Sequence, residues 1–448
     1  MTLAHPLTVP PPTGTQRLLA APGPGLDAHH RTHGPLPHVG PGIIDEIGLA
    51  GVDGRGGAGF PLARKLDAVA GRTRRGSRGA PIVIANGAEG EPASRKDAVL
   101  LERAPHLVLD GIVVAALAIG ATEAVVATSA RLADRVRQAL AERTDGRRGT
   151  GTDPVAIEVR ALPHTTFVAG QATALASAVA GGRGLPEDRV VRLADRGPSG
   201  RPTLVSNVET LAQAALVARY GAAWARSVGS ASAPGTRLVT VSDVTDPGGA
   251  VVLETAGGAP LGQLLGASRL PAADPRRTRA VLLGGWGGTW VPAAALDAAF
   301  DVDGLAPWGA APGAGVLAVL DDRTCPVGVT AGLAAALAGA SAGRCGPCVN
   351  GLPRIADVVA DLASGRRAGD LAGEVRRVAA LVDGRGACHH PDGVARMVRS
   401  ALDVFHDDVQ AHLRGACLVG PGAAGSGSAG SGSAGSGSAG SGSVGGLR

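Results

Sequence analysis

Apolar residues between positions 41 and 225 follow two alternating patterns, and this alternation predicts an α/β domain. Short apolar runs typical of buried strands lie at 81–85, 123–128 and 155–159. Longer stretches with helical spacing lie at 97–120, 130–143, 170–180 and 207–220. Strands that alternate with helices favour a largely parallel sheet. We therefore expect a Rossmann-like domain whose ligand site lies at the carboxyl ends of its strands.

The pattern changes after residue 225. Between 235 and 322, strand-like runs at 236–242 and 314–320 are separated by turns rich in glycine and proline, which predicts a small β-rich domain. From 326 to 418 the apolar spacing is helical again, and it predicts a helical bundle. Its helical stretches lie at 329–340, 353–364, 371–382 and 393–413.

The two ends of the chain differ from the rest in composition. Residues 1–40 are rich in proline, glycine and histidine and show little periodicity, so we interpret them as an irregular N-terminal arm. Residues 421–448 repeat serine, alanine and glycine, which cannot bury a core, and are predicted to form a disordered tail.

Composition excludes several classes of protein. The chain has 448 residues and a formal net charge of +5, without the interleaved basic and aromatic residues of a nucleic-acid groove. The best candidate for a membrane span, 112–120, is far too short, and the N-terminus lacks the features of a secretory signal. Five cysteines, an odd number, argue against a disulfide framework. We therefore expect a cytoplasmic protein that binds no nucleic acid and does not insert into a membrane.

Two short segments carry the strongest chemical signal. Residues 54–61, Gly-Arg-Gly-Gly-Ala-Gly-Phe-Pro, form a glycine loop that lets backbone N–H groups approach a phosphate. Residues 86–92, Asn-Gly-Ala-Glu-Gly-Glu-Pro, place two carboxylates in a turn directly after the apolar run at 82–84. The only lysines of the chain, Lys65 and Lys96, follow these segments. Together these features indicate a site for a phosphate-bearing cofactor with an electron-rich ring.

Three of the cysteines have the spacing of metal ligands. Cys345 and Cys348 are separated by a Gly-Pro pair, and Cys388 follows them in the same helical region. A cofactor loop and such cysteines in one chain point to electron transfer. Cys325 and Cys417 have no partner in spacing, and we interpret them as core or surface thiols.

From about residue 45 to about 415, the chain resembles the flavoprotein subunit of bacterial respiratory complex I, which oxidises NADH. The same family includes diaphorase subunits of soluble hydrogenases and of NAD-linked formate dehydrogenases. The resemblance runs in order through residues 54–61 with Lys65, 86–92, 96–97, 102–107, 170–175 and 206–210. It implies that 41–225 form an FMN- and NADH-binding α/β domain. It also implies that 235–322 form a ubiquitin-like, soluble-ligand-binding β-grasp domain and that 326–418 form a helical iron–sulfur-binding domain.

The resemblance also implies which residues bind the cofactors. Glycines of the 54–61 loop give backbone contacts, and Lys65 supplies a positive charge to the phosphates. Asn86 and Asn207 hydrogen-bond the flavin or its ribityl chain, while Glu89 and Glu91 line the ring and help to orient the nicotinamide. The full set of expected cofactor-binding residues is Gly54, Arg55, Gly56, Gly57, Phe60, Lys65, Asn86, Glu89, Glu91, Gly170, Ser206 and Asn207.

For the iron–sulfur region, the resemblance implies that Cys345, Cys348 and Cys388 are metal ligands. The family carries Cys-x-x-Cys-x-x-Cys, and Ala342 stands here in place of the first cysteine. A [4Fe–4S] cluster then needs a fourth ligand such as His389 or His390, and a [3Fe–4S] cluster is an alternative. A zinc ion on the three cysteines and a histidine, or a bundle without metal, also fits.

The implied function is electron transfer from NADH through FMN to an iron–sulfur cluster and on to a partner, with no covalent catalytic residue in the protein. The partner is a ferredoxin-like or membrane-associated electron acceptor within a hetero-oligomer, which can hold the chain at the inner face of a membrane. Departures from the family pattern at Leu66, Ala68, Ala88 and Gln171-Ala172 reduce the aromatic and acidic groups expected around NADH. They leave two alternatives, a docking or assembly subunit without catalysis and a flavoprotein fed by a different donor.

Overall fold

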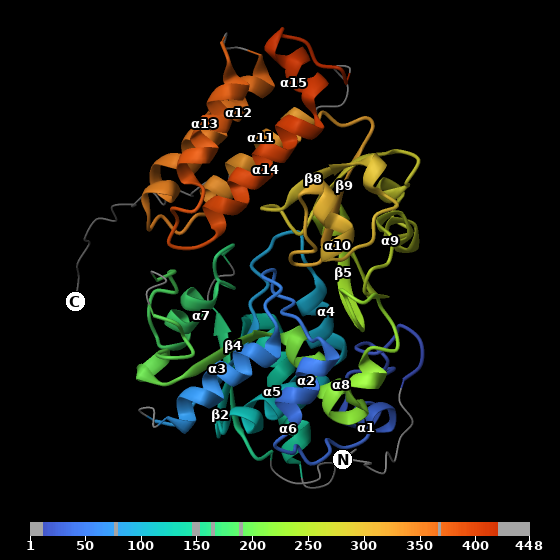
Figure 1. Cartoon of the computed structure of the whole chain (residues 1–448), viewed down its shortest axis with the longest axis vertical. Coiled ribbons are helices and arrows are strands. Elements are labelled where there is room, and N and C mark those ends of the chain that lie inside the picture. Colours follow the sequence, from blue (N-terminus) through green and yellow to red (C-terminus); the bar gives the residue numbers. More distant parts are fainter. Residues whose placement is uncertain are drawn as a thin grey trace, which may run out of the picture.

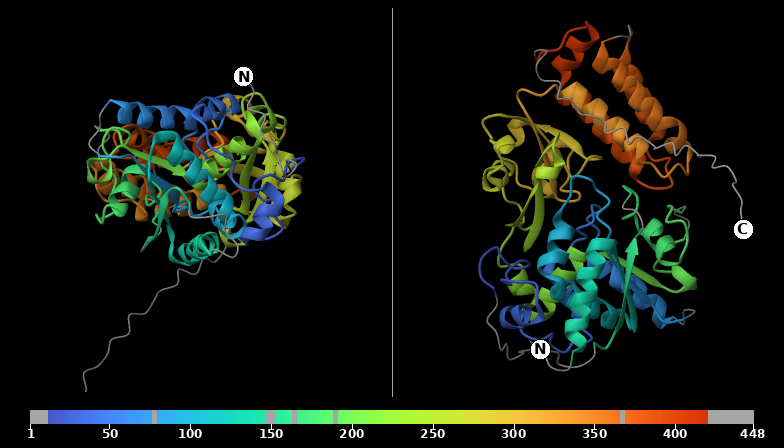
Figure 2. Two further views of the ribbon diagram at one scale, coloured as in Figure 1. Left: turned by 90° about the horizontal axis from the view of Figure 1, so that it is seen from below. Right: turned by 180° about the vertical axis from the view of Figure 1, so that it is seen from behind.

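The computed structural model describes residues 12–75, 79–145, 153–162, 166–187, 191–365 and 369–419. Its elements form an α/β region around a parallel sheet, a second sheet, and a set of helices towards the C-terminal end (Figure 1). In the front and back views, the second sheet and the C-terminal helices lie at the same end of the α/β region (Figures 1 and 2). The predicted tail at 421–448 and residues 1–11 of the predicted arm lie outside the described residues.

Four parallel strands form the first sheet: β1 (Ile82–Gly87), β2 (Glu123–Ser129), β3 (Ala156–Leu162) and β4 (Thr203–Asn207). Their spatial order is β3-β2-β1-β4. The chain thus moves outward from β1 to β3 and then returns to the other side of β1 as β4. Ligands of such sheets bind beyond the carboxyl ends of the strands where the order reverses, which here lies between β1 and β4. The parallel sheet confirms the α/β prediction.

Side chains alternate between the two faces of this sheet. Val83 and Ala85 of β1 face a large apolar core, whereas Ile82 and Ile84 face a smaller one. The large core is completed by α2 (Ile43–Ala50), α3 (Leu62–Arg74), α5 (Pro105–Ile119), α6 (Ala130–Thr144) and α8 (Val208–Ala225). The smaller core is covered by α7 (Ala172–Val179). The sheet is therefore a middle layer with helices on both sides.

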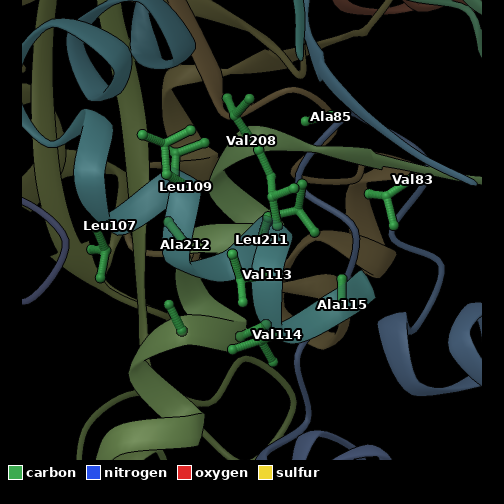
Figure 3. Packing of buried hydrophobic residues seen from close by; sticks show 14 of the residues in the cluster. Val83, Ala85, Leu107, Leu109, Val113, Val114, Ala115, Val208, Leu211 and Ala212 are labelled. Carbon is green, nitrogen blue, oxygen red and sulfur yellow. The ribbon is translucent and has the colours of Figure 1, made fainter. Parts of the chain in front are cut away.

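Helices α5 and α8 cross closely in the large core. Figure 3 shows side chains of the two helices, among them Val113 and Leu211, lying together beside the strand residue Val83. Gly111 makes the crossing possible, because a methyl group at this position would lie 1.9 Å from the carbonyl oxygen of Leu211. The backbone of α8 thus occupies space that the Cβ atom of any other residue would need.

Two stretches predicted as single helices are each divided in the structure. The stretch 97–120 is broken into α4 (Lys96–Arg103) and α5, because Pro105 lacks the N–H that a continuing helix needs and starts a new helix instead. The stretch 393–413 is broken at the buried Phe405 into α14 (His390–Val404) and α15 (His406–Leu413). Apolar spacing continues across both breaks, so periodicity did not reveal them.

The N-terminal arm is not irregular throughout, in contrast to the prediction. Residues Leu26–His33 form α1, whose His29 bonds through Nε2 to the buried carboxylate of Asp110 on α5 at 2.8 Å. Before α1, the backbone N–H groups of Leu18 and Leu19 donate to the carboxylate of Glu254 in the second sheet. Because an isolated helix this short is unstable in water, α1 depends on tertiary contacts that the sequence pattern does not show.

Five strands form the second sheet, in the order β6-β5-β9-β7-β8. They are β5 (Thr236–Asp243), β6 (Val251–Ala256), β7 (Thr278–Leu283), β8 (Thr289–Pro292) and β9 (Val316–Asp321). β5 and β9 are parallel, and the other neighbours are antiparallel. α9 (Leu261–Ser268) packs on one face of the sheet, and the short α10 (Val302–Leu305) precedes β9.

The C-terminal helices share a core with the other face of the second sheet. α11 (Pro326–Gly339), α12 (Leu352–Ser364), α13 (Leu371–Val382) and α14 pack in a closed ring, each against the next. Leu282, Trp290 and Leu320 of the sheet contribute to their apolar core. The backbone N–H of Trp290 also donates to the hydroxyl of Ser400 on α14 at 3.0 Å. Within the described ranges, none of the helices has the length and apolar character needed to cross a membrane.

We expect Gly111→Ala to lower the free energy of unfolding by about 1–3 kcal/mol, because the added methyl group forces α5 away from α8. The matched control is Gly332→Ala on α11, where a methyl group would meet no atom within 4 Å. The free energy of unfolding of that variant should rise by about 0.4–1 kcal/mol, because alanine restricts the conformations of the unfolded chain. Urea unfolding measures both values, and equal responses of the two variants would contradict the close crossing.

Candidate cofactor sites

The glycine loop lies at the carboxyl end of β4. The backbone N–H of Gly54 donates to the carbonyl oxygen of Phe60 at 3.0 Å and closes the loop just before α3. Gly57 has φ 107°, a conformation that glycine adopts readily and other residues do not. The N–H of Arg55 donates to the hydroxyl of Thr210 at 2.8 Å, which fixes the loop to the first turn of α8. A methyl group on Gly56 would lie 3.5 Å from Cβ of Asn207, so the loop borders the point where the strand order reverses.

Two polar groups beside the loop lack the partners that buried groups usually have. The ammonium of Lys65 lies 3.4 Å from the carbonyl oxygen of Val205, and burial lowers its pKa. Within the described part of the chain, no carboxylate forms an ion pair with it. The hydroxyl of Ser206 is buried and has no hydrogen-bond partner among the residues that the structure describes. A cation without a carboxylate and an unpaired hydroxyl, next to a glycine loop, fit the phosphate and polar chain of FMN.

Phe60 presents the one exposed aromatic ring near the loop. It is 45% exposed, and among the large apolar side chains that the structure describes as exposed it is the only aromatic. The guanidinium of Arg64 lies 5.8 Å from its ring centre. By contrast, Leu66 is fully buried in the large core and faces away from any ligand surface. An aromatic platform for a bound base therefore depends on Phe60.

The two carboxylates of the acidic turn are held by backbone N–H groups of the protein. Glu89 accepts hydrogen bonds from the N–H groups of Asp97 and Ala98 at 2.9 and 3.0 Å, which satisfies the N-terminus of α4. Glu91 accepts from the N–H of Trp286, in the turn between β7 and β8, at 3.0 Å. Burial raises the pKa of Glu91 to about 7, against the lowering effect of its backbone hydrogen bonds. Both residues thus have structural partners, and their expected role beside the flavin ring stays a prediction.

The two asparagines lie opposite each other at the ends of β1 and β4. Asn86 donates from Nδ2 to the carbonyl oxygen of Gly170 at 2.7 Å, which brings Gly170 to the end of the sheet as expected. Asn207 donates from Nδ2 to Asp97 at 2.7 Å, and its Oδ1 caps α8 through the N–H of Glu209 at 3.0 Å. Asn207 also donates from Nδ2 to the backbone carbonyl oxygen of Asn86 at 3.5 Å, so both of its N–H donors have partners within the protein. The amide of Asn86 carries a second N–H donor, which can bond to a ligand.

A buried network of charges surrounds Asn207. The ammonium of Lys96 lies 2.7 Å from Asp97 and 3.0 Å from Glu209, and all three side chains are almost completely buried. Burial alone lowers the pKa of Lys96, but the two carboxylates raise it above its ordinary value. Burial lifts the pKa of Asp97 to about 6, although Lys96 opposes this. Lys96 is therefore a structural cation, unlike Lys65.

Phe167 connects the acidic turn with the segment that carries Cys388. A methyl group on Gly90 would lie 2.5 Å from the carbonyl oxygen of Phe167, so the acidic turn and this segment are in backbone contact. The ring of Phe167 lies 4.7 Å from the ring of His390, centre to centre. His390 follows Cys388 by two positions and bonds through Nε2 to the carbonyl oxygen of Leu337 at 2.8 Å.

The predicted metal ligands lie near one another. Cys345 and Cys348 are separated by 3.5 Å between their sulfur atoms at the single turn of π-helix Pro347–Gly351. Burial raises the pKa of the Cys348 thiol, and the nearby Cys345 and Cys388 raise it further. A close pair of thiols with a third one nearby fits a soft metal centre such as an iron–sulfur cluster. Of the two candidate histidine ligands, His389 is exposed and bonds through Nδ1 to Asp392 at 2.8 Å, whereas His390 bonds to Leu337 as described.

The two remaining cysteines do not stand alone, in contrast to the interpretation from spacing. The sulfur atom of Cys325 lies 3.3 Å from Nε2 of His412, and Cys417 is the third member of the group. The ligand atoms of these three residues lie within 4.8 Å of one another. The short spacing from His412 to Cys417 is a signal in the sequence, but only the fold brings Cys325 to them.

Two family models match this chain. Residues 47–216 match the Nuo51 FMN-binding domain, and residues 328–412 match the NADH-ubiquinone oxidoreductase-F iron-sulfur binding region. The first match contains the glycine loop and the ends of β1 and β4, and the second contains the cysteines 345, 348 and 388. Fold and sites therefore define a flavoprotein with an iron–sulfur region, which confirms both cofactor expectations at the level of the family.

An NADH-quinone oxidoreductase subunit of Rhizobium meliloti (strain 1021) is 30% identical over 383 residues, which cover 83% of this chain and 88% of the relative. The corresponding NADH-quinone oxidoreductase subunit of Escherichia coli (strain K12) is 26% identical over 381 residues, which cover 83% of this chain and 84% of the relative. The chain belongs to the family of these NADH-quinone oxidoreductase subunits, as the resemblance indicated. A solved structure of an NAD+-reducing [NiFe]-hydrogenase in the air-oxidized state is also similar, with a TM-score of 0.73 and 28% identity. That match covers 90% of this chain and 65% of the hydrogenase chain.

The raised pKa of Glu91 predicts a pH-dependent contribution to stability. Between its ordinary value of 4.5 and about 7, the folded chain holds a proton on Glu91 that the unfolded chain has released. The stability from this proton is complete at low pH and is lost as the pH rises through about 7. We therefore expect the wild type to lose on the order of 1 kcal/mol relative to Glu91→Gln across this range.

Chemical unfolding of the two apoproteins at several pH values measures this difference. Other titrating groups, including Asp97, are common to both proteins and cancel. A difference that does not change with pH would contradict the buried, proton-holding state of Glu91.

Proposed function

We propose that the chain is an electron-transfer subunit that binds FMN at the ends of β1 and β4, accepts electrons from NADH there, and passes them to an iron–sulfur cluster at Cys345, Cys348 and Cys388. The observation that carries the proposal is the convergence of the glycine loop, the Lys65 ammonium and the unpaired Ser206 hydroxyl at the point where the strand order reverses. A buried hydroxyl without a partner is uncommon in folded proteins and needs an explanation, which a ligand bound beside the glycine loop supplies.

The chemistry that FMN supplies when bound is acceptance of a hydride and release of single electrons. The residues of the chain bind the cofactor, orient it and shield it from water. The loop N–H groups and Lys65 hold the phosphate, and Phe60 offers its face to a base. The second N–H donor of Asn86 can bond to the polar chain, while Asn207 holds the ends of β1 and β4 together through its bond to the carbonyl oxygen of Asn86. The buried charges around Lys96 keep α4 and the start of α8 in place beneath the site.

The contact between Phe167 and His390 supports the proposed route between the two cofactor sites. It connects the acidic turn with the segment that carries Cys388, without a polar solvent layer between the two rings. We therefore assign the iron–sulfur cluster, which receives the electrons from the flavin, to Cys345, Cys348 and Cys388. A fourth ligand from water or His389 completes a [4Fe–4S] cluster, because Ala342 cannot serve.

The finer fold assignments of the family also belong to this proposal. The second sheet has two antiparallel hairpins around a parallel central pair, with α9 on one face, which supports a ubiquitin-like β-grasp domain over 235–322. The closed ring of helices supports an iron–sulfur-binding bundle over 326–418. The FMN domain then comprises 41–225.

The names of the relatives indicate what kind of partner this chain has. Several of them are named as subunits of an NADH-quinone oxidoreductase, so we propose that this chain also works within a hetero-oligomer. Electrons leave the cluster for a ferredoxin-like or membrane-associated acceptor subunit. Such a partner holds the chain on the cytoplasmic side, at the periphery of a membrane or in solution.

An optical spectrum of protein purified without air tests the function directly. We expect flavin absorption with a broad iron–sulfur shoulder, and loss of the flavin bands on addition of NADH. If the flavin bands persist with NADH but bleach with dithionite, the flavin is reducible and its natural donor is a compound other than NADH. A protein without flavin absorption after incubation with FMN would contradict the proposal and favour a docking subunit.

We expect Lys65→Met to weaken FMN binding by about tenfold to a hundredfold, because one charge-assisted contact with the phosphate is lost. The matched control is Arg74→Met, an exposed cation on the same helix, which should leave binding unchanged. Quenching of flavin fluorescence measures the affinity, and unchanged unfolding of Lys65→Met shows that the loss is local. Equal FMN affinities of the two variants would contradict the proposed contact between Lys65 and the phosphate.

A further inference from the structure

We propose that Cys325, His412 and Cys417 form a second metal site, which binds a zinc-type divalent cation and fastens the C-terminal segment to the start of α11. The three ligand atoms lie within 4.8 Å of one another. Cys325 and Cys417 lie outside residues 328–412, the part of the chain that matches the iron–sulfur region of the family. The site is therefore independent of the proposed electron-transfer function.

The geometry is close to what a tetrahedral ion needs. With Zn–S bonds of about 2.3 Å and Zn–N bonds of about 2.0–2.1 Å, sulfur and nitrogen ligands lie about 3.6 Å apart, and two sulfurs about 3.8 Å apart. The sulfur of Cys325 lies 3.3 Å from Nε2 of His412. Small rotations of the side chains bring all three atoms to the required distances.

The ligand types favour zinc over the harder cations. Two thiolates and one imidazole are soft or borderline donors, whereas magnesium and calcium select oxygen ligands. Cys325 caps α11, where its sulfur accepts from the N–H of Gly328 at 3.4 Å, and this bond fixes the sulfur at the start of the helix. The exposed position of Cys417 leaves the fourth coordination place open to water.

The site is also distant from the cysteines assigned to the cluster. Cys325 caps the first turn of α11 and Cys345 follows its last turn, and a helix of 14 residues is about 21 Å long. One ion therefore cannot serve both groups. The two thiol sets lie towards opposite ends of this helix.

A bound ion would hold together elements that otherwise meet weakly. Cys325 lies in the short connection between β9 and α11, and His412 lies near the end of α15. α15 already contacts the second sheet through the ion pair of Asp408 with Arg279 on β7. Metal binding at the connection would fix α15 and the chain after it relative to both the sheet and the ring of helices.

Cobalt binding to the full-length reduced protein tests the proposal, because Co²⁺ replaces zinc and shows intense visible bands only with thiolate ligands in tetrahedral geometry. The background carries Cys345→Ser and Cys388→Ser, which leaves Cys348 as the one thiol of the other set. We expect one tightly bound ion per chain, displaced by an equivalent of zinc. Zinc should also raise the melting temperature.

Two ligand variants and one control assign the ligands. His412→Gln and Cys325→Ser should each weaken cobalt binding by at least about tenfold to a hundredfold and remove the thermal effect of zinc. The control His406→Gln alters an exposed histidine on the same helix and should bind like its parent. A parent protein without tetrahedral cobalt bands overturns the proposal. So does equal binding by His412→Gln and its control, or a Cys325–Cys417 disulfide in the purified chain together with no metal binding after reduction.

Discussion

The ammonium of Lys96 is the constraint on which the arrangement of the molecule depends. It is buried between Asp97 of α4 and Glu209 of α8, and the same Glu209 accepts the backbone N–H of Leu238 on β5 at 2.9 Å. One network thus joins the first sheet, the helices beneath the cofactor site and the second sheet. Buried charges are tolerated only when all partners are present, and the loss of one costs about 3–5 kcal/mol. The position of each element therefore depends on the others.

Close backbone contacts explain how the acidic turn reaches three parts of the fold. Gly90 lies against Phe167, and a methyl group on Gly285 would lie 2.3 Å from a carboxylate oxygen of Glu91. Side chains at either glycine would separate the turn from its neighbours. The turn thereby connects the end of β1 with the second sheet on one side and with the segment leading to Cys388 on the other. This arrangement places the proposed flavin site and the proposed cluster in one continuous packed region.

The C-terminal helices contain two thiol groups of different character. Cys345 and Cys348 lie beyond the last turn of α11, near Cys388 and the ring of His390. Cys325 lies at the first turn of the same helix, with His412. The second set lies at the connection between β9 and α11, next to the end of α15. A single helix thus separates a proposed redox centre from a proposed structural one.

Local sequence determined the elements whose signals are short and strong. The glycine loop, the strand before Asn86 and the Cys345–Cys348 pair lie where their motifs indicated, because steric and periodic constraints act within a few residues. The sequence by itself also placed the chain in its family. Tertiary structure alone decided what those residues contact. It gave Glu89 and Glu91 backbone partners and formed α1 from an arm without periodicity. It also buried Lys96 among carboxylates, whereas Lys65 has no carboxylate partner within the described ranges. It also brought Cys325 to His412. These outcomes depend on burial and on pairing between distant segments, and neither quantity is encoded in the spacing of residues along the chain.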